Sequence, residues 1–205
     1  MKRIYSTFTP KENALSIPFT TMDLKLERKH RALQQQWEQL FARLQGLDDE
    51  QLNRQPQLNK WSVIQVLFHL IQSDRLVTAY VLKKMRTEGE LAKTGFRTWF
   101  RTVLLQVALR GPFKFKAPPM VAQVPAFETL AVIKSAWRQA DQDFYNLLAS
   151  FPPHLVGREI FRHPYAGRLN LHQTLDFMAD HFAHHLKQVD RLLEGSIPGS
   201  EKSIT

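Results

Sequence analysis

Three histidines lie within a nine-residue stretch near the end of the chain, from Asp180 to Gln188. The leucines and aromatics around them recur at helical spacing, so we expect one helix over residues 171–193. Side chains four residues apart on a helix are neighbours, about 6 Å apart, so His181 and His185 could hold one metal ion together. A histidine pair on a helix can equally be structural, with each ring hydrogen-bonded and no metal present. The pair alone leaves both roles open.

The angular positions on this helix separate the three histidines. At 100° per residue, His185 lies about 40° from the centre of the apolar stripe, His181 about 80° and His184 about 140°. His184 is therefore predicted to point outward. Asp180 and Asp190 lie at angles that favour solvent, so neither can be named as a general base.

Composition limits the chemistry that the chain can perform. The 205 residues are 43% hydrophobic and 23% charged, which is typical of one globular domain. Because the sequence has no cysteine, disulfides, thiolate ligands and a cysteine nucleophile are excluded. It has no apolar run of about 18 residues. Its first twenty residues lack the apolar core of a signal peptide, so we expect a cytoplasmic protein.

The net charge of +9 raises the question of an anionic partner. The lysines and arginines are spread along the whole chain, without an arginine-rich helix, a glycine-rich phosphate loop or zinc-finger spacing. A basic balance alone is only an electrostatic preference. The sequence therefore argues against direct binding of nucleic acid.

Four stretches have the periodicity of amphipathic helices, and these must position the histidines. They cover residues 21–46, 62–87, 127–149 and 171–193. Leucines recur every seven residues in the first stretch, which is typical of a helix packed against a partner. Four such helices with one long crossover between the second and third predict an all-α four-helix bundle. Bundles of this kind commonly build metal sites from facing helices.

Local signals mark where the helices begin. Thr21 is predicted to cap the first helix and Asn170 the fourth, because their side-chain oxygens can accept hydrogen bonds from free backbone N–H groups. The connection over residues 163–169 is predicted to be a turn or short hairpin, with Gly167 available for a positive φ.

The chain is expected to form one bundle domain, over residues 21–194, with an extended arm over 1–20 and a flexible polar tail over 195–205. Residues 88–125 form the crossover between the second and third helices. Within it, Phe96 to Leu109 has the pattern of a short basic amphipathic helix, a composition found at membrane surfaces. We favour the alternative, a crossover that packs its aromatics over one end of the bundle.

The second helix is apolar on more than one side, which is more apolar surface than a lone bundle needs, so we expect a homodimer. Ile64, Leu67 and Ile71 belong to its best apolar stripe. His69 falls on nearly the opposite side, where the simplest role of a lone histidine is that of a half-buried, hydrogen-bonded ring.

Several short motifs, taken in their order, resemble the DinB/YfiT-like superfamily of metal-dependent enzymes. They are Asn59-Lys60-Trp61-Ser62 followed by Val66-Leu67-Phe68-His69-Leu70, then His163-Pro164 with Gly167, then His181-x-x-His184-His185-x-x-Gln188. The resemblance covers residues 20–195. It implies an up-down-down-up bundle in which His69, His181 and His185 bind a divalent metal, zinc or nickel. His69 enters this set through the resemblance alone.

Three imidazoles leave a coordination position open for water or a substrate, as in catalytic metal sites. By resemblance, the expected activity is that of a small-thiol S-transferase or a hydrolase acting on a small-molecule substrate, with a low-molecular-weight thiol as cosubstrate in the first case. Gln188 lies on the metal side of its helix and can hydrogen-bond a ligand histidine. The alternative function is a non-catalytic dimeric bundle that meets an anionic partner or membrane surface through the basic crossover.

Overall fold

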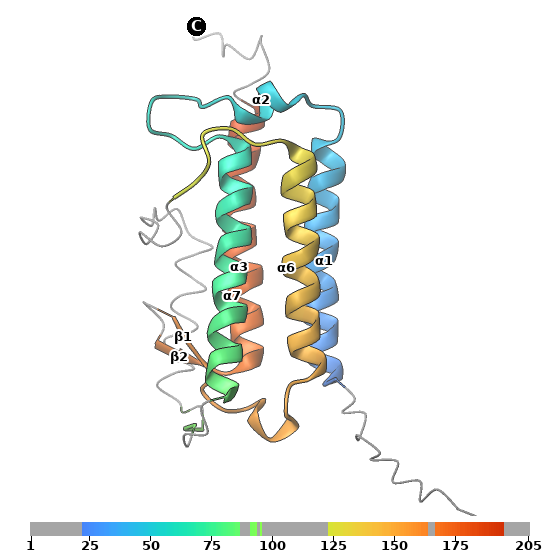
Figure 1. The fold of residues 1–205 in the computed structure, drawn as a ribbon, viewed down its shortest axis with the longest axis vertical. Helices are drawn as coiled ribbons and strands as arrows, with labels where there is room; N and C mark the ends of the chain where they lie inside the picture. The colour runs from blue at the N-terminus through green and yellow to red at the C-terminus, as the bar shows by residue number, and fades with distance from the viewer. Residues whose placement is uncertain (1–21, 87–90, 94, 96–122, 164–166, 195–205) are drawn as a thin grey trace, which may run out of the picture.

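The computed structural model describes residues 22–86, 91–93, 95, 123–163 and 167–194 (Figure 1). Within these ranges the chain is mainly helical, so the all-α prediction is confirmed. The helices are α1 Leu24–Leu44, α2 Asp49–Asn53, α3 Val63–Arg86, α6 Leu130–Ala149 and α7 Leu171–Glu194. A short 3-10 turn, η1 Pro153–Leu155, and two strands, β1 Phe161–His163 and β2 Gly167–Leu169, connect α6 to α7.

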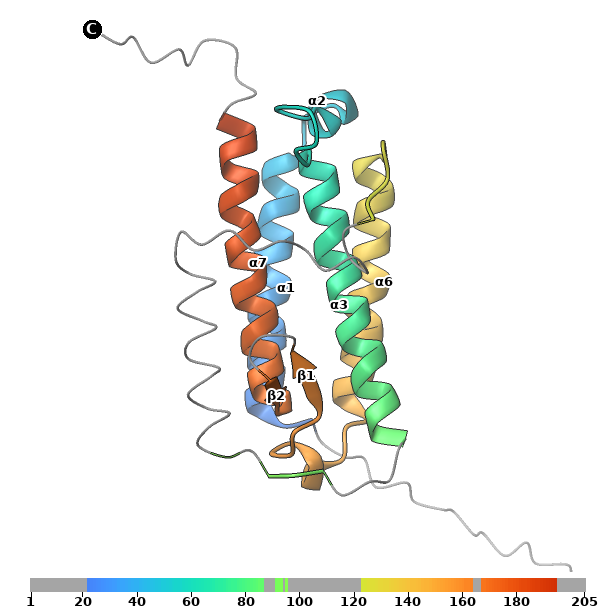
Figure 2. The same cartoon turned by 90° about the vertical axis from the view of Figure 1, so that its left-hand side faces the viewer.

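The long helices pack as a bundle. In Figure 1, α1 and α7 run upward and α3 and α6 run downward. Helix α3 contacts both α6 and α7, and α1 contacts the same two helices from the other side (Figure 2). The predicted arm and tail, and most of the predicted crossover, lie outside the described residues. No helix in the described ranges is both long and apolar enough to cross a membrane.

Aromatic rings fill the middle of the bundle. Trp37 of α1 is 1% exposed. Its ring lies 5.0 Å from Phe182 of α7, 5.8 Å from Trp137 of α6 and 5.5 Å from Phe41, measured between centroids. The predicted seven-residue repeat accounts for this, because the leucines of α1 that share the inward face with Trp37 are buried as well.

Two predicted helix starts are wrong, and one helix was not predicted. Helix α1 begins at Leu24, and the side chain of Asp23 accepts hydrogen bonds from its first turn. Thr21, the predicted cap, lies outside the described residues. Helix α6 begins at Leu130 behind the cap residue Thr129, three residues after the predicted start. Helix α2 lies between the first two predicted helices, where Asp48 provides a capping box. In each case the helix starts where a nearby side chain accepts hydrogen bonds from free N–H groups. Hydrophobic periodicity carries no information about such caps.

The predicted turn before the last helix is a two-stranded antiparallel hairpin. Phe161 pairs with Leu169 and His163 with Gly167. Gly167 has φ of 79°, a conformation that costs glycine little. The hairpin contacts α3 and α7 on the side of the bundle where the two helices face each other, so it can contribute to a site between them.

Truncating Trp37 to alanine should remove the centre of the aromatic core. We expect the free energy of unfolding to fall by about 3–5 kcal/mol, the usual cost of deleting a buried aromatic side chain. Urea denaturation followed by circular dichroism measures this change. As a control, Leu58→Ala alters a residue that is 87% exposed and should change stability by less than about 0.5 kcal/mol. A loss for Trp37→Ala as small as that of the control would contradict this account of the core.

Candidate metal centre

The two helices that carry the predicted ligands begin in the same way. At the start of α3, the backbone N–H of Gln65 donates to Ser62 Oγ, and the backbone N–H of Ser62 donates to Gln65 Oε1. At the start of α7, Asn170 and Gln173 exchange the corresponding pair of hydrogen bonds. Both are capping boxes, which satisfy free N–H groups reciprocally and define where the helix starts. The cap predicted for Asn170 is confirmed.

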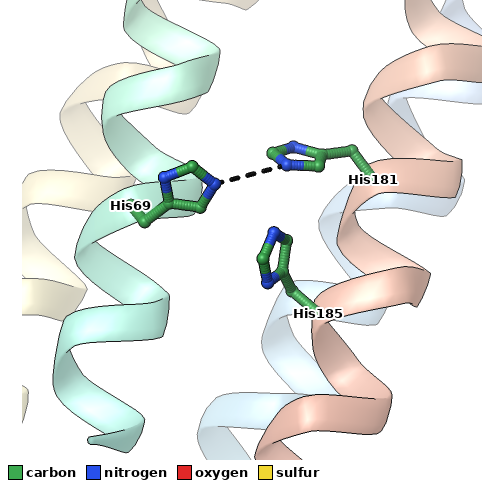
Figure 3. Close-up of side chains that lie close together, drawn as sticks. All are labelled: His69, His181 and His185. Atoms are coloured by element: carbon green, nitrogen blue, oxygen red, sulfur yellow. Dashed lines mark hydrogen bonds between the residues drawn. The ribbon is translucent and has the colours of Figure 1, made fainter. Parts of the chain in front are cut away.

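Helices α3 and α7 bring His69, His181 and His185 together. Figure 3 shows the imidazole of His69 extending from α3 toward the two imidazoles of α7. One ring nitrogen from each residue lies within 4.8 Å of the other two. His69 is 3% exposed, and the other two histidines are half-buried. The structure therefore places the three predicted ligands in one cluster.

The spacing of the nitrogens fits a small tetrahedral ion. The Nε2 atoms of His69 and His181 are 3.4 Å apart (Figure 3). Two ligand nitrogens that each lie about 2.0–2.1 Å from a tetrahedral zinc ion are about 3.3–3.4 Å from each other. These two imidazoles are thus already at the separation that a shared metal requires. The third histidine adds an imidazole on the same side, which gives an all-nitrogen donor set.

Burial keeps the two imidazoles of α7 uncharged. Desolvation and the neighbouring imidazoles hold the pKa of His181 well below its usual value of 6.5. The same causes, desolvation first, lower the pKa of His185 to about 3. A neutral imidazole has a nitrogen lone pair available, whereas an imidazolium cannot bind a metal. At neutral pH both rings of α7 are consequently in the form that binds metal.

Residues around the cluster fix the orientation of its rings. His185 Nδ1 lies 3.0 Å from Gln188 Oε1, so Nδ1 donates and Nε2 keeps its lone pair. Trp61 packs against His69 with 4.9 Å between ring centroids, and Phe177 stacks on His181 at 5.5 Å and 15°. Sequence reasoning assigned a role to Gln188 but not to the two aromatics. The contact of Phe177 could have been predicted, because Phe177 precedes His181 by four residues on the same helix.

The hairpin adds a fourth buried histidine near the cluster. His163 is 8% exposed, and its ring meets Phe177 edge to face at 4.4 Å. Burial lowers the pKa of His163 to about 4, so it too is neutral at physiological pH. Phe177 therefore lies between His163 and His181, which links the hairpin to the histidine cluster through ring contacts.

Periodicity located the remaining polar residues less well. It placed His69 away from the apolar stripe of its helix, yet α3 is buried on two sides and His69 faces α7. The prediction that Asp180 faces solvent is wrong, since this residue is 7% exposed. His184 is half-buried and packs edge-on to His185 with 5.2 Å between centroids, but its nitrogens are not among the three that converge.

The chain is similar to known proteins over most of its length. Over 151 residues the chain is 28% identical to the uncharacterized protein YuaE of Bacillus subtilis (strain 168), covering 74% of this chain and 88% of YuaE. Residues 32–189, which include all of the converging histidines, match the family model of the DinB superfamily. The chain therefore belongs to the DinB superfamily.

Proposed function

We propose that the protein is a metal-dependent enzyme in which His69, His181 and His185 bind one divalent ion, zinc or nickel. The convergence of three imidazole nitrogens within 4.8 Å supports this proposal. Three neutral nitrogen ligands suit both metals, and they leave room for at least one further ligand. An open position is the feature that separates catalytic metal sites from closed structural ones.

The proposed reaction is S-transfer from a low-molecular-weight thiol, or hydrolysis of a small substrate. A divalent ion in such a site lowers the pKa of a bound thiol or water, so that a nucleophile is available at neutral pH. Since the chain has no cysteine, the sulfur in an S-transfer would come from the cosubstrate. It would form the new bond to carbon while the leaving group departs with its electron pair.

The residues around the histidines would prepare the site for this chemistry. Gln188 holds His185 in the tautomer whose Nε2 faces the cluster. Trp61 and Phe177 cover faces of His69 and His181, which restricts the imidazoles to few orientations and keeps water from those faces. A site whose rings are fixed before metal binds loses less conformational entropy when it binds.

Metal content tests the proposal directly. Protein purified without a tag or chelator should contain about one zinc or nickel ion per chain by plasma mass spectrometry. The double variant His181→Ala, His185→Ala should contain none, because only one imidazole would remain. His184→Ala is the matched control, since it removes a neighbouring histidine on the same helix and should keep the metal. Wild-type protein that stays metal-free after incubation with zinc or nickel would refute the site.

The same samples test the reaction class. Metal-loaded wild-type protein should consume a small thiol in the presence of an alkylating electrophile, or hydrolyse an ester or amide probe. The double variant should do neither. If wild-type protein binds metal stoichiometrically but is inactive in both assays, the metal site is supported and the proposed reactions are refuted.

Gln188 should tune metal affinity through His185. We expect Gln188→Ala to weaken zinc binding about tenfold or more, the usual effect of removing a hydrogen-bond partner of a ligand histidine. Gln188→Glu keeps an oxygen acceptor and should stay close to wild-type affinity. Competition with a chromophoric chelator measures both constants. Equal affinities for wild type and Gln188→Ala would show that the contact does not orient the ring.

Metal-free protein should lose stability in acid because of its buried histidines. The folded-state pKa values of His181, His185 and His163 all lie below the usual 6.5. As the pH falls below 6.5, the unfolded chain therefore takes up protons that the folded chain excludes. Each such histidine lowers the free energy of unfolding by about 1.4 kcal/mol per pH unit until its folded pKa is reached.

Urea denaturation between pH 7.5 and 4.5 measures this slope in chelator-treated protein. The double variant His181→Ala, His185→Ala should show a shallower slope than wild type over the same range. Parallel slopes for the two proteins would contradict the assignment of these rings as neutral.

A further inference from the structure

A second polar cluster lies inside the bundle, away from the histidine centre. It surrounds a cavity of roughly 10 Å³ between α1, α3, α6 and α7, the size that holds about one water molecule. Three of the lining side chains can ionise, and the others are mainly apolar. The ionisable ones are His30, Asp74 and Asp141, and the apolar ones include Trp37, Trp137 and Met178.

Asp141 of α6 lines this cavity and has both carboxylate oxygens occupied. His30 Nε2 lies 2.8 Å from Asp141 Oδ1, and Gln34 Nε2 donates to Asp141 Oδ2 at 2.5 Å. His30 is 3% exposed, so this bond between α1 and α6 is largely shielded from water. The cluster His30–Gln34–Asp141 therefore presents a hydrogen-bonded carboxylate to the cavity.

Asp74 of α3 is half-buried and lines the same cavity as His30 and Asp141. Burial, helped by the charge of Asp141, raises the pKa of Asp74 to about 8. No lysine or arginine lines this cavity, its one basic side chain is His30, which pairs with Asp141, and α7 contributes the apolar Met178. The adjacent Arg75 directs its guanidinium to the carbonyl oxygen of Ala136 at 3.2 Å. At neutral pH Asp74 thus keeps its proton and is a hydrogen-bond donor.

We propose that Asp74, as a neutral acid, donates a hydrogen bond through one water in this cavity to the His30–Gln34–Asp141 cluster. Its proton would then act as a pH-sensitive link between α3 and the α1–α6 pair. The cavity has room for that water and supplies it with polar partners. Loss of the proton leaves the two carboxylates of Asp74 and Asp141 on one small cavity whose other lining side chains, apart from His30, are apolar. When two carboxylates are close together, ionisation of both is unfavourable, and the pKa of one of them is raised.

The sign of the pH effect follows from proton linkage. The folded pKa of about 8 lies above the usual aspartate value of 3.8, so folding takes up a proton between these two values. The stabilising contribution of Asp74 is complete below about pH 4 and is lost as the pH rises toward 8. This direction is opposite to that of the buried histidines, so the two effects can be separated by variants.

Asp74→Asn tests the link, because asparagine is neutral at every pH and keeps a donor. The unfolding equilibrium constant of wild type relative to Asp74→Asn should rise about tenfold per pH unit between pH 5 and 8 and level off above. Urea denaturation of the full chain measures both proteins. Asp143→Asn is the matched control on α6, and because Asp143 is exposed its ratio to wild type should stay constant. A constant ratio for Asp74→Asn would overturn the proposal.

Infrared spectroscopy of the wild type gives a readout that depends on no variant folding. A carbonyl band of a protonated carboxylic acid should be present at pH 6 and disappear by about pH 9.5, one and a half units above the value for Asp74. The band should be absent from Asp74→Asn and present in Asp143→Asn. Absence of the band in wild type at pH 6 would overturn the proposal.

Discussion

The packing of α3 against α7 is the constraint on which the histidine centre depends. His69 and His181 are 112 residues apart in the chain, so only tertiary structure can bring them together. A shift of α7 by one residue would move its side chains by about 1.5 Å along the axis and 100° around it. Phe182 prevents this, because it is buried against Trp37 and thereby fixes the rotation of the helix. With Phe182 held inward, His181 and His185 face α3.

Burial acts on both polar clusters of the bundle and favours the uncharged form in each. At the histidine centre it removes protons, which leaves lone pairs for a metal. At the inner cavity it retains a proton on Asp74. The two clusters meet different faces of α3, only five residues apart along it. A helix that is buried on two sides can therefore carry an electron-pair donor on one face and a proton donor on the other.

Much of this arrangement was predictable from the sequence, and the failures have physical causes. The heptad leucines of α1, the capping by Asn170 and the His181–His185 pair are local patterns, and the structure shows all three. His69 was predicted only from the family resemblance. Its helix is buried on two sides, so the apolar stripe does not show which face turns toward α7. The burial of Asp180 and the cluster around Asp141 depend on which helices become neighbours, and no local pattern contains that information.

The order of the helices along the chain also decides when the histidine centre can exist. His69 is synthesised 112 residues before His181, an interval of about 6–22 s at ordinary translation rates. In a zinc finger the ligands are close in sequence, and metal binding drives folding. Here the ligand set is completed only when α7 docks onto a bundle whose other helices were made earlier. Under the proposed function, metal would therefore bind late, to a chain that has already folded and that selects from the ions its compartment supplies.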